Sequence, residues 1–511
     1  MSSNLIARLL KSDHGAVAPT VGISLFALVA AGGIAFDYAR MATLDTELQN
    51  AADQAALAAA TQLDGKANAR SRATSAAQTL VTNQTLMAND VGTRAISVPT
   101  VTFYVDKPRT TVATTDADAN FVLVTVGTRE AFFALTPIVA AISSGPIAAS
   151  AYAGLGTAIC KVPPVMMCNP AEPMNNTNPD FDFDANALRG VGMKLITGNA
   201  SAPGNFGFLE TGFGNGAQDL ARALGYNTPP GDCMPSDGVS TKPGLNASVM
   251  DALNTRFDLD TNGSQTCPGG GTCSPSRNVR KDLVRGNQCG TSGQQGWQES
   301  PNPYRPTTTT PITSGYPDIM GHPRDLCHAI SNDLSASISA GCSSGAGRIG
   351  NGQWDRNAYF QVNYGWNAST WPTMTGLSSS ATRYEVYQWE IANPANIDTP
   401  QSVGGNKSGY GAPVCRGAGI TPGGTNVDRR RISAAVLNCR ALGLNGSETN
   451  VPVLKWIDLF LVEPSYQRRD GSTTVTEATD VYVELIGETN SGAAGATAGQ
   501  VVRRDVPYLI E

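Results

Sequence analysis

The chain has 511 residues and a formal net charge of −6, with 41% hydrophobic and 15% charged residues. This length exceeds what one hydrophobic core supports and predicts two or three domains, and the composition excludes a disordered or fibrous chain. No concentrated basic face is visible, which argues against nucleic acid as a partner. The one arginine run, Arg429 to Arg431, follows Asp428 and is expected to lie on a solvated surface.

Residues 1–14 form a short basic leader, and residues 15–36 contain no charged side chain. About 20 apolar residues in a helix span the hydrocarbon core of a bilayer, so 15–36 predicts a transmembrane helix. The alternative is a cleaved secretory signal, but the run is longer than the usual apolar core and continues into helix-forming sequence. Arg8 and Lys11 favour a cytoplasmic N-terminus, with the bulk of the chain outside.

Residues 37–64 continue this helix as an alanine-rich stalk. Apolar and small residues recur at steps of three and four, which predicts a face that packs closely on another helix or a sheet. Within the membrane run, small residues four apart could admit a partner helix and support a helix-mediated oligomer. The predicted packing positions are Ala18, Gly22, Ala27, Ala31, Met41, Leu44, Leu48, Ala51, Ala55 and Ala58.

Residues 65–158 form the next predicted region, which is small, strand-rich and pilin-like in arrangement. Alternation of apolar and polar residues predicts strands within 98–105 and 120–128. Residues 131–160 are also uncharged, but Pro137 and the Gly145-Pro146 pair interrupt a helix. The stretch therefore predicts an apolar loop or short helix followed by a strand, in preference to a second membrane span.

Residues 159–511 have a different composition, rich in Gly, Pro and Cys, which predicts a further α+β domain. Short helices are expected at 215–224 and 246–256, and strands at 383–392, 453–462 and 480–487. The predicted fold class is therefore α+β, with one transmembrane helix, a stalk helix and a mainly β body.

The ten cysteines all lie beyond residue 159, and their number is even. No CxxC spacing occurs and the chain has three histidines, so disulfides in an oxidising compartment are favoured over a zinc site. The pairing stays open among Cys160, Cys168, Cys233, Cys267, Cys273, Cys289, Cys327, Cys342, Cys415 and Cys439.

The basic leader, the run "GAVAPTVGISLFALVAAGGIAFDYAR" and the segment "LQNAADQAALAAA" resemble the N-terminus of TadE/TadG-like Flp (tight adherence) pilus-assembly proteins. The resemblance covers about 50 residues. It implies an inner-membrane protein with a periplasmic body that works with other Tad/Flp assembly proteins. Pseudopilin members carry glutamate five residues after a cleavage-site glycine; Thr20 holds that position after Gly15, which favours the stably anchored TadG-like type.

Two motifs in the body weakly indicate a functional site, one for calcium and one for a hydrolase nucleophile. Asp258, Asp260 and Asn262 match the first half of a calcium loop, but Gly269 occupies the position of the closing glutamate, which favours a polar turn. Ser343 lies in a GxSxG string whose flanks lack the strand and helix of a nucleophile elbow.

We therefore expect a non-catalytic structural component of a Flp pilus assembly machine, with no cofactor and no confident metal site. The alternatives are a membrane-tethered periplasmic hydrolase that uses Ser343 with His322 or His328, and a calcium-dependent adhesive protein.

Overall fold

The computed structural model divides into two compact units, Met1–Gly156 with Asp505–Glu511, and Thr157–Arg504. The last strand, near the C-terminus, pairs with a strand of the first unit, and the domain boundary predicted at 159 stays a prediction. The described residues are 17–64, 66–79, 84–90, 94–105, 109–116, 118–135, 144–160, 165–195, 206–210, 216–230, 234–235, 238–242, 247–261, 266–331, 342, 347–424, 426–489 and 502–510.

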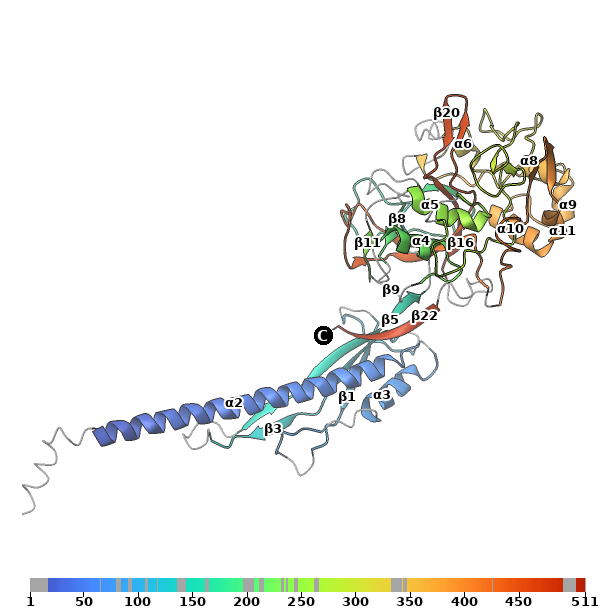
Figure 1. Cartoon of the computed structure of the whole chain (residues 1–511). Helices are drawn as coiled ribbons and strands as arrows, with labels where there is room; N and C mark the ends of the chain where they lie inside the picture. The colour runs from blue at the N-terminus through green and yellow to red at the C-terminus, as the bar shows by residue number, and fades with distance from the viewer. Residues whose placement is uncertain are drawn as a thin grey trace, which may run out of the picture. The chain divides into compact units, whose positions relative to one another are not determined.

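The N-terminal unit is built on one long helix, α2 (Val17–Ala60), which continues without a break from the predicted membrane run into the stalk (Figure 1). A shorter helix, α3 (Ala69–Thr79), packs beside it. The main sheet has the order β1-β2-β5-β22, and β3 pairs with β4 in a separate hairpin. The strands are β1 (Thr100–Tyr104), β2 (Phe121–Thr125), β3 (Arg129–Phe132), β4 (Ser144–Ile147), β5 (Ser150–Cys160) and β22 (Val502–Leu509).

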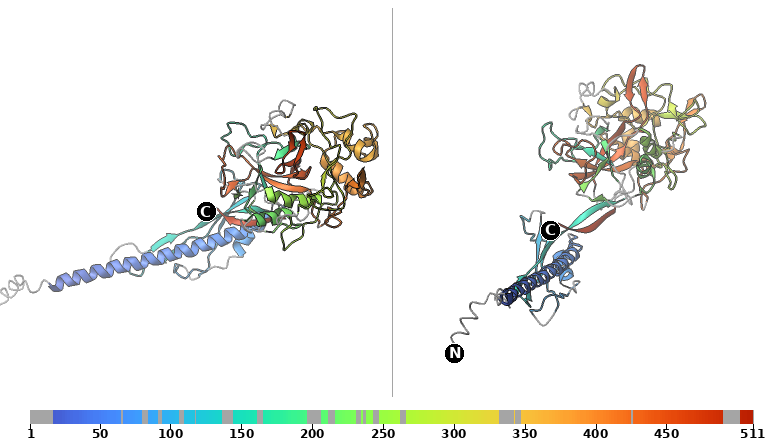
Figure 2. Two further views of the ribbon diagram at one scale, coloured as in Figure 1. Left: turned by 45° about the horizontal axis from the view of Figure 1, so that its top comes forward. Right: turned by 60° about the vertical axis from the view of Figure 1, so that its left-hand side comes forward.

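The second half of α2 packs on this sheet through leucines and alanines, whereas its first half projects beyond the strands of its own unit (Figure 2). Leu44 and Leu48 are fully buried, and alanines continue the buried face at one or two positions per turn. Alanine side chains are small, so the helix axis can approach the sheet closely. The strands contribute alternate residues such as Val122 and Val124, as the period of two predicts.

The second unit is organised around a seven-stranded sheet of order β11-β8-β6-β16-β18-β21-β7. β6 and β16 are parallel, and the other neighbours are antiparallel. The strands are β6 (Val165–Cys168), β7 (Gly192–Leu195), β8 (Phe206–Leu209), β11 (Thr241–Lys242), β16 (Arg431–Leu437), β18 (Lys455–Leu461) and β21 (Val481–Glu488).

Both faces of this sheet are covered, which explains the continuous apolar runs of β18 and β21. Leu459 and Val483 face the core shared with α4 (Ala217–Gly225) and α5 (Ala247–Asn254). Phe460 and Tyr482 face the opposite side, in a cluster with Tyr387. Strands predicted at 453–462 and 480–487, and helices predicted at 215–224 and 246–256, correspond to these elements.

The remaining elements are short; among them β9 pairs with β5, and the other strands form small sheets of two to four strands. The 3-10 turn η3 (Thr255–Phe257) follows α5. The other helices are α6 (Leu326–Ala329), α8 (Arg356–Tyr364), α9 (Trp371–Thr375), α10 (Arg383–Ala392) and α11 (Ala395–Asp398). The other strands are β9 (Met234–Pro235), β10 (Gly238–Val239), β12 (Leu283–Arg285), β13 (Gln298–Glu299), β14 (Gln401–Gly404), β15 (Lys407–Gly409), β17 (Val451–Pro452), β19 (Arg468–Asp470) and β20 (Thr473–Thr476).

The strand predicted at 383–392 is wrong, because this segment is helix α10. Thr382 accepts a hydrogen bond from the backbone N–H of Glu385, and the Glu385 carboxylate accepts one from the N–H of Thr382. This reciprocal pair is a capping box. The Thr-x-x-Glu spacing was visible in the sequence and outweighs the β-favouring tyrosines and tryptophan that follow it.

Four disulfides join eight of the ten cysteines within the second unit. Cys168–Cys439 links the ends of neighbouring strands across a separation of 271 residues, and Cys289–Cys415 spans 126. Cys267–Cys273 and Cys327–Cys342 close short loops. The side chains of Cys160 and Cys233 lie outside the described residues.

Candidate functional site

A clamp between α2 and the β3–β4 hairpin lies where the uncharged run ends. Asp37 is only 1% exposed, although it belongs to the helix that leaves the predicted membrane segment. Its two carboxylate oxygens accept the backbone N–H groups of Ala134 and Leu135, both at 2.9 Å. One turn earlier, a Cβ added to Gly33 would lie 2.8 Å from the Cβ of Leu135, so only glycine permits this approach. The buried face of α2 therefore begins inside the uncharged run.

Two further polar side chains support the hairpin. Arg40 lies next along the helix and donates to the carbonyl of Phe132 at 3.4 Å. Asn89 accepts the N–H of the same Phe132 at 2.7 Å, and Asp90 forms a largely buried ion pair with Arg129 at 2.9 Å. These contacts hold the described part of the hairpin to the helix and give the backbone N–H groups of Phe132, Ala134 and Leu135 side-chain acceptors.

The predicted packing residues divide into two groups in the structure. Leu44, Leu48, Ala51 and Ala55 are fully buried, and Met41 and Ala58 are half-buried at the edges of the same face. In the membrane run, Gly22, Ala27 and Ala31 are exposed, and the side chain of Ala18 lies outside the described residues. The role of this second group in helix pairing stays a prediction.

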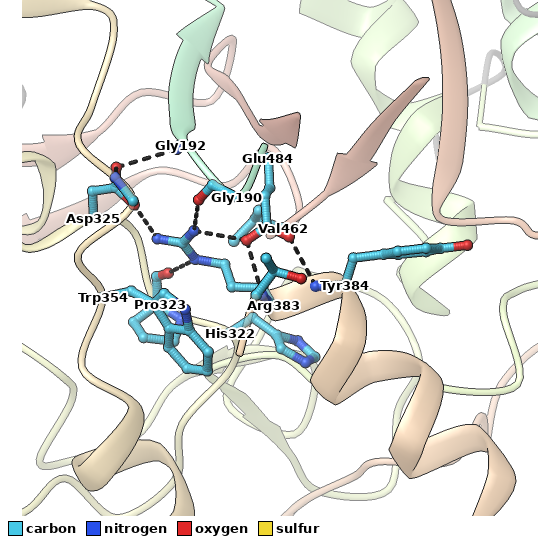
Figure 3. Close-up of polar contacts among 12 residues, drawn as sticks. Gly190, Gly192, His322, Pro323, Asp325, Trp354, Arg383, Tyr384, Val462 and Glu484 are labelled. Atoms are coloured by element: carbon cyan, nitrogen blue, oxygen red, sulfur yellow. Dashed lines mark hydrogen bonds and ion pairs between the residues drawn. The ribbon is translucent and has the colours of Figure 1, made fainter. Parts of the chain in front are cut away.

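In the second unit, a fully buried arginine on α10 joins several loops to the sheet (Figure 3). The guanidinium of Arg383 pairs with Glu484 of β21 at 2.9 Å and with Asp325, the residue preceding α6. It also donates to the carbonyls of Pro323 at 2.6 Å and Gly190 at 3.4 Å. A buried charge is tolerated when it is paired and its donors are satisfied, and this site meets both conditions.

Backbone N–H groups, as well as charged side chains, hold the two carboxylates of this site in place. Asp325 accepts the N–H groups of Gly192 (3.1 Å), Asn351 (2.9 Å) and Gly352 (2.8 Å). A Cβ at Gly350 would meet an Asp325 oxygen at 2.0 Å, so glycine is required there. Glu484 accepts the N–H groups of Arg383 and Tyr384, both at 2.9 Å, where the positive end of the α10 dipole favours a carboxylate.

A second buried cluster surrounds Glu390, on the last turn of α10. Its carboxylate accepts from Tyr359 and Asn278 at 2.5 Å and pairs with Arg280 at 3.2 Å. Burial raises the pKa of Glu390, but the Arg280 charge and the contact with His322 outweigh it and hold the pKa well below its usual range. Burial lowers the pKa of His322 to about 4. The cluster therefore contains a carboxylate and a neutral imidazole, neither open to solvent.

The other histidine of the hydrolase alternative has a similar environment. Both ring nitrogens of His328 are occupied, Nδ1 by the hydroxyl of Tyr482 at 2.9 Å and Nε2 by the carbonyl of Gly347 at 2.8 Å. A carbonyl only accepts, so Nε2 carries the proton and Nδ1 accepts from Tyr482. Burial and the nearby Lys194 charge lower the pKa of His328 to about 3. His328 thus orders the core as a neutral residue, and Ser343 lies outside the described residues.

The prediction that Arg429 to Arg431 form a solvated face is wrong, because all three are buried. They enter the central strand β16, where solvent is excluded, and their donors bind protein oxygens instead of water. Arg431 pairs with Asp458 of β18. Arg429 and Arg430 donate mainly to carbonyls, those of Ser274 and Tyr226 at 2.8 Å, Leu461 at 3.0 Å and Val462 at 2.9 Å.

The calcium candidate has its oxygens occupied by protein donors. Asp258 accepts three consecutive backbone N–H groups, from Val414 to Arg416, at 2.6 to 2.8 Å. Asp260 pairs with the Arg416 guanidinium at 2.7 Å. Asn262 lies outside the described residues. These contacts explain the loop as a carboxylate-centred turn, the interpretation that the sequence favours, and calcium binding stays the untested alternative.

One group of side chains has the spacing of a metal site. Ligand atoms of Cys327, His328 and Cys342 lie within 4.8 Å of one another. The two sulfurs are bonded to each other, and both imidazole nitrogens are occupied as described above. A disulfide sulfur is not a thiolate ligand, so this arrangement favours a disulfide packed on a structural histidine.

The described hollows offer little for substrate chemistry. A cavity of about 40 Å³ beside His322 and Arg324 has room for a few water molecules, whereas sites for organic ligands usually measure about 300–1,000 Å³. Hollows of about 550 Å³ near Tyr226 and about 360 Å³ near Trp354 are larger. Neither of these two has a carboxylate or an imidazole among its described lining residues.

Sequence reasoning missed both the Asp37 clamp and the Arg383 network. Asp37 could have been found, since an acidic residue directly after an uncharged run needs a partner close to the membrane. The network joins residues more than 100 positions apart, such as Arg383 with Glu484. No local pattern identifies such partners.

Together these features define a class, a disulfide-bonded α+β protein with a single N-terminal helix suited to anchoring it in a membrane. Among the helices that the structure describes, α2 is the one long and apolar enough to cross a bilayer. Residues 15–62 match the family model for Flp pilus-assembly TadE/G-like proteins. The matched segment covers the membrane run and the stalk, as the resemblance in the sequence implied. No curated protein and no solved structure is significantly similar to the chain.

Proposed function

We propose that this chain is a TadG-like, single-pass component of the inner membrane that supports assembly of a Flp (Tad) pilus without catalysing a reaction. The observation that carries the proposal is the coincidence of the family match at 15–62 with α2. One half of this helix exposes apolar side chains to its surroundings, and the other half is the core of a small domain.

The orientation of the chain has two supports. Arg8 and Lys11 precede the membrane run and favour a cytoplasmic N-terminus. Four disulfides in the second unit favour an oxidising compartment, which for an inner-membrane protein is the periplasm. Other pilus-assembly proteins are the partners implied by the family.

A non-catalytic role is supported by the burial and the protonation state of the two candidate catalytic histidines. His322 and His328 are buried and neutral, and their nitrogens contact protein atoms. A general base must reach a substrate proton, which neither imidazole can do from these positions.

Gene deletion with complementation tests the assembly role. The deletion strain should lack surface Flp pili and surface adhesion, and the wild-type chain should restore both. Ser343→Ala should restore them equally, whereas its failure would favour the hydrolase alternative. Normal piliation in the deletion strain would overturn the proposal.

Orientation is tested with a C-terminal fusion to alkaline phosphatase, an enzyme that needs disulfides to become active. We expect an active fusion. An inactive alkaline phosphatase fusion, together with a fluorescent green-fluorescent-protein fusion at the same position, would place the body in the cytoplasm instead.

A further inference from the structure

We infer that the β3–β4 hairpin is a second membrane contact, with Leu135 and Phe132 facing lipid beside the spanning helix. The inference rests on the proposed membrane anchor and adds an interfacial element to it. Its partner is the bilayer surface itself.

The depth of the hairpin follows from its contacts with α2. Leu135 packs against Gly33, which lies within the uncharged run and three residues before its end at Phe36. At 1.5 Å per residue, this contact is about 5 Å inside the run. If residues 15–36 cross the hydrocarbon core, Leu135 cannot lie outside the membrane surface.

The hairpin runs along the helix toward this depth. Gly145 of β4 lies against Met41, since a Cβ added there would meet the end of the Met41 side chain. Gly145 pairs with Ala131 of β3. Met41 and Gly33 are eight residues apart on α2, so the hairpin extends about 12 Å along the helix between these two contacts. Figure 1 shows β3 beside the middle of α2, with the N-terminal part of the helix continuing beyond it.

The exposed side chains at this end of the hairpin suit lipid. Leu135 is 39% exposed and Phe132 is 46% exposed, and Ile34 and Phe36 of α2 are exposed at the same level. In sequence, residues 131–160 carry no charge. This apolar surface is continuous with the apolar surface of the spanning helix, which is why lipid is the partner we assign to it.

The clamp also meets the main requirement for irregular backbone near lipid. Amide groups find no water partner in a bilayer and must be satisfied by the protein. Asp37 accepts the N–H groups of Ala134 and Leu135, and Asn89 accepts that of Phe132. In a loop open to water, solvent satisfies such amides instead.

Site-specific photo-crosslinking tests the inference on the full chain. A diazirine amino acid replaces Leu135, Phe132, Phe26 or Leu86 in turn, and the protein is reconstituted in vesicles of phosphatidylethanolamine and phosphatidylglycerol. Phe26 is 60% exposed within the membrane run and is the positive control. Leu86 is 65% exposed, and its N–H binds Glu47, about 21 Å beyond Gly33 along α2, so it is the matched negative control.

We expect lipid adducts from positions 26 and 135 at comparable yield, a lower yield from 132, and at least tenfold less from 86. Adducts from 26 but not from 135 and 132 would overturn this inference alone. Lipid adducts from none of the four positions would overturn the membrane anchor as well. Crosslinks from 135 to a second protein chain in place of lipid would assign the surface to a protein partner and overturn the lipid contact.

Discussion

The two units of this protein bury different kinds of surface. The core of the N-terminal unit is apolar, with leucines and alanines of α2 against valines of a small sheet. The second unit also has an apolar core, but on one side of its sheet it buries arginines, carboxylates, histidines and tyrosines that contact one another. Close apolar packing stabilises most of the first unit, with a few polar contacts such as the Asp37 clamp at the hairpin, whereas the second unit contains many buried charged groups and is destabilised when one partner of a pair is lost.

This difference teaches how a glycine- and proline-rich chain with short elements can be held in one conformation. Arg383 binds three segments at once, at Gly190, at residues 323–325 and at Glu484, and Asp325 accepts three backbone amides from two segments, the start of β7 and the loop at 351–352. Directional contacts of this kind specify loop positions that apolar packing leaves free. Disulfides add further constraints between distant segments.

The largest expected effect is a loss of stability of the second unit when its longest disulfide-closed loop is opened. The Cys168→Ala/Cys439→Ala variant loses a link across 271 residues, worth about 6 kcal/mol in the chain-entropy model, whereas Cys267→Ala/Cys273→Ala loses about 2 kcal/mol. All six tryptophans lie in the second unit, so fluorescence during urea denaturation of the full chain reports on it. Equal losses from the two variants would contradict this ordering.

Removal of the central arginine tests whether the polar network holds the second unit. Arg383→Met should lower the free energy of unfolding by about 3–5 kcal/mol, because Asp325 and Glu484 would stay buried without their partner. The matched control is Arg189→Met, which breaks an exposed pair with Glu385 and should cost about 0–1 kcal/mol. Tryptophan fluorescence measures both, and a similar cost for the two variants would refute the importance of burial.

The pH dependence of stability distinguishes the units because His322 and His328 are buried in the second. Both are neutral when folded, with pKa values of about 4 and about 3, whereas an unfolded histidine takes up a proton near pH 6.5. Their contribution is complete above about pH 6.5 and is lost as the pH falls toward 4, by up to about 1.4 kcal/mol per pH unit for each histidine. Denaturation of His322→Gln/His328→Gln should show a flatter slope in this window, and an unchanged slope would count against neutral histidines.

The smallest effect tests the close packing of the N-terminal unit. Ala55→Leu inserts methylenes between α2 and the sheet and should cost about 1–3 kcal/mol. Asn50→Leu, at an exposed position of the same helix, is the control and should change stability by less than about 0.5 kcal/mol. Amide hydrogen exchange of α2 peptides measures both variants; equal protection would mean that the alanine face tolerates larger side chains.

Much of the fold could be predicted because its signals are local. The uncharged run, the helical period of the stalk and the alternation in β1 and β2 each depend on neighbouring residues. Helix α10 was also locally encoded, since Thr382 and Glu385 form its capping box, but the β-favouring side chains after them suggested a strand. In this segment the cap outweighs the β propensity of the side chains.

The sequence by itself determined the apolar run that is long enough to cross a membrane, the helix that continues it, the α+β class, the family segment and the use of cysteines as disulfides. The tertiary structure decided how eight of the cysteines pair, that Arg429 to Arg431 are buried, and that Asp37 holds a hairpin where the uncharged run ends. The physical reason is the range of the interactions. Periodicity and hydropathy act over a few residues, whereas the environment of a charge depends on partners that only the folded chain brings within hydrogen-bonding distance.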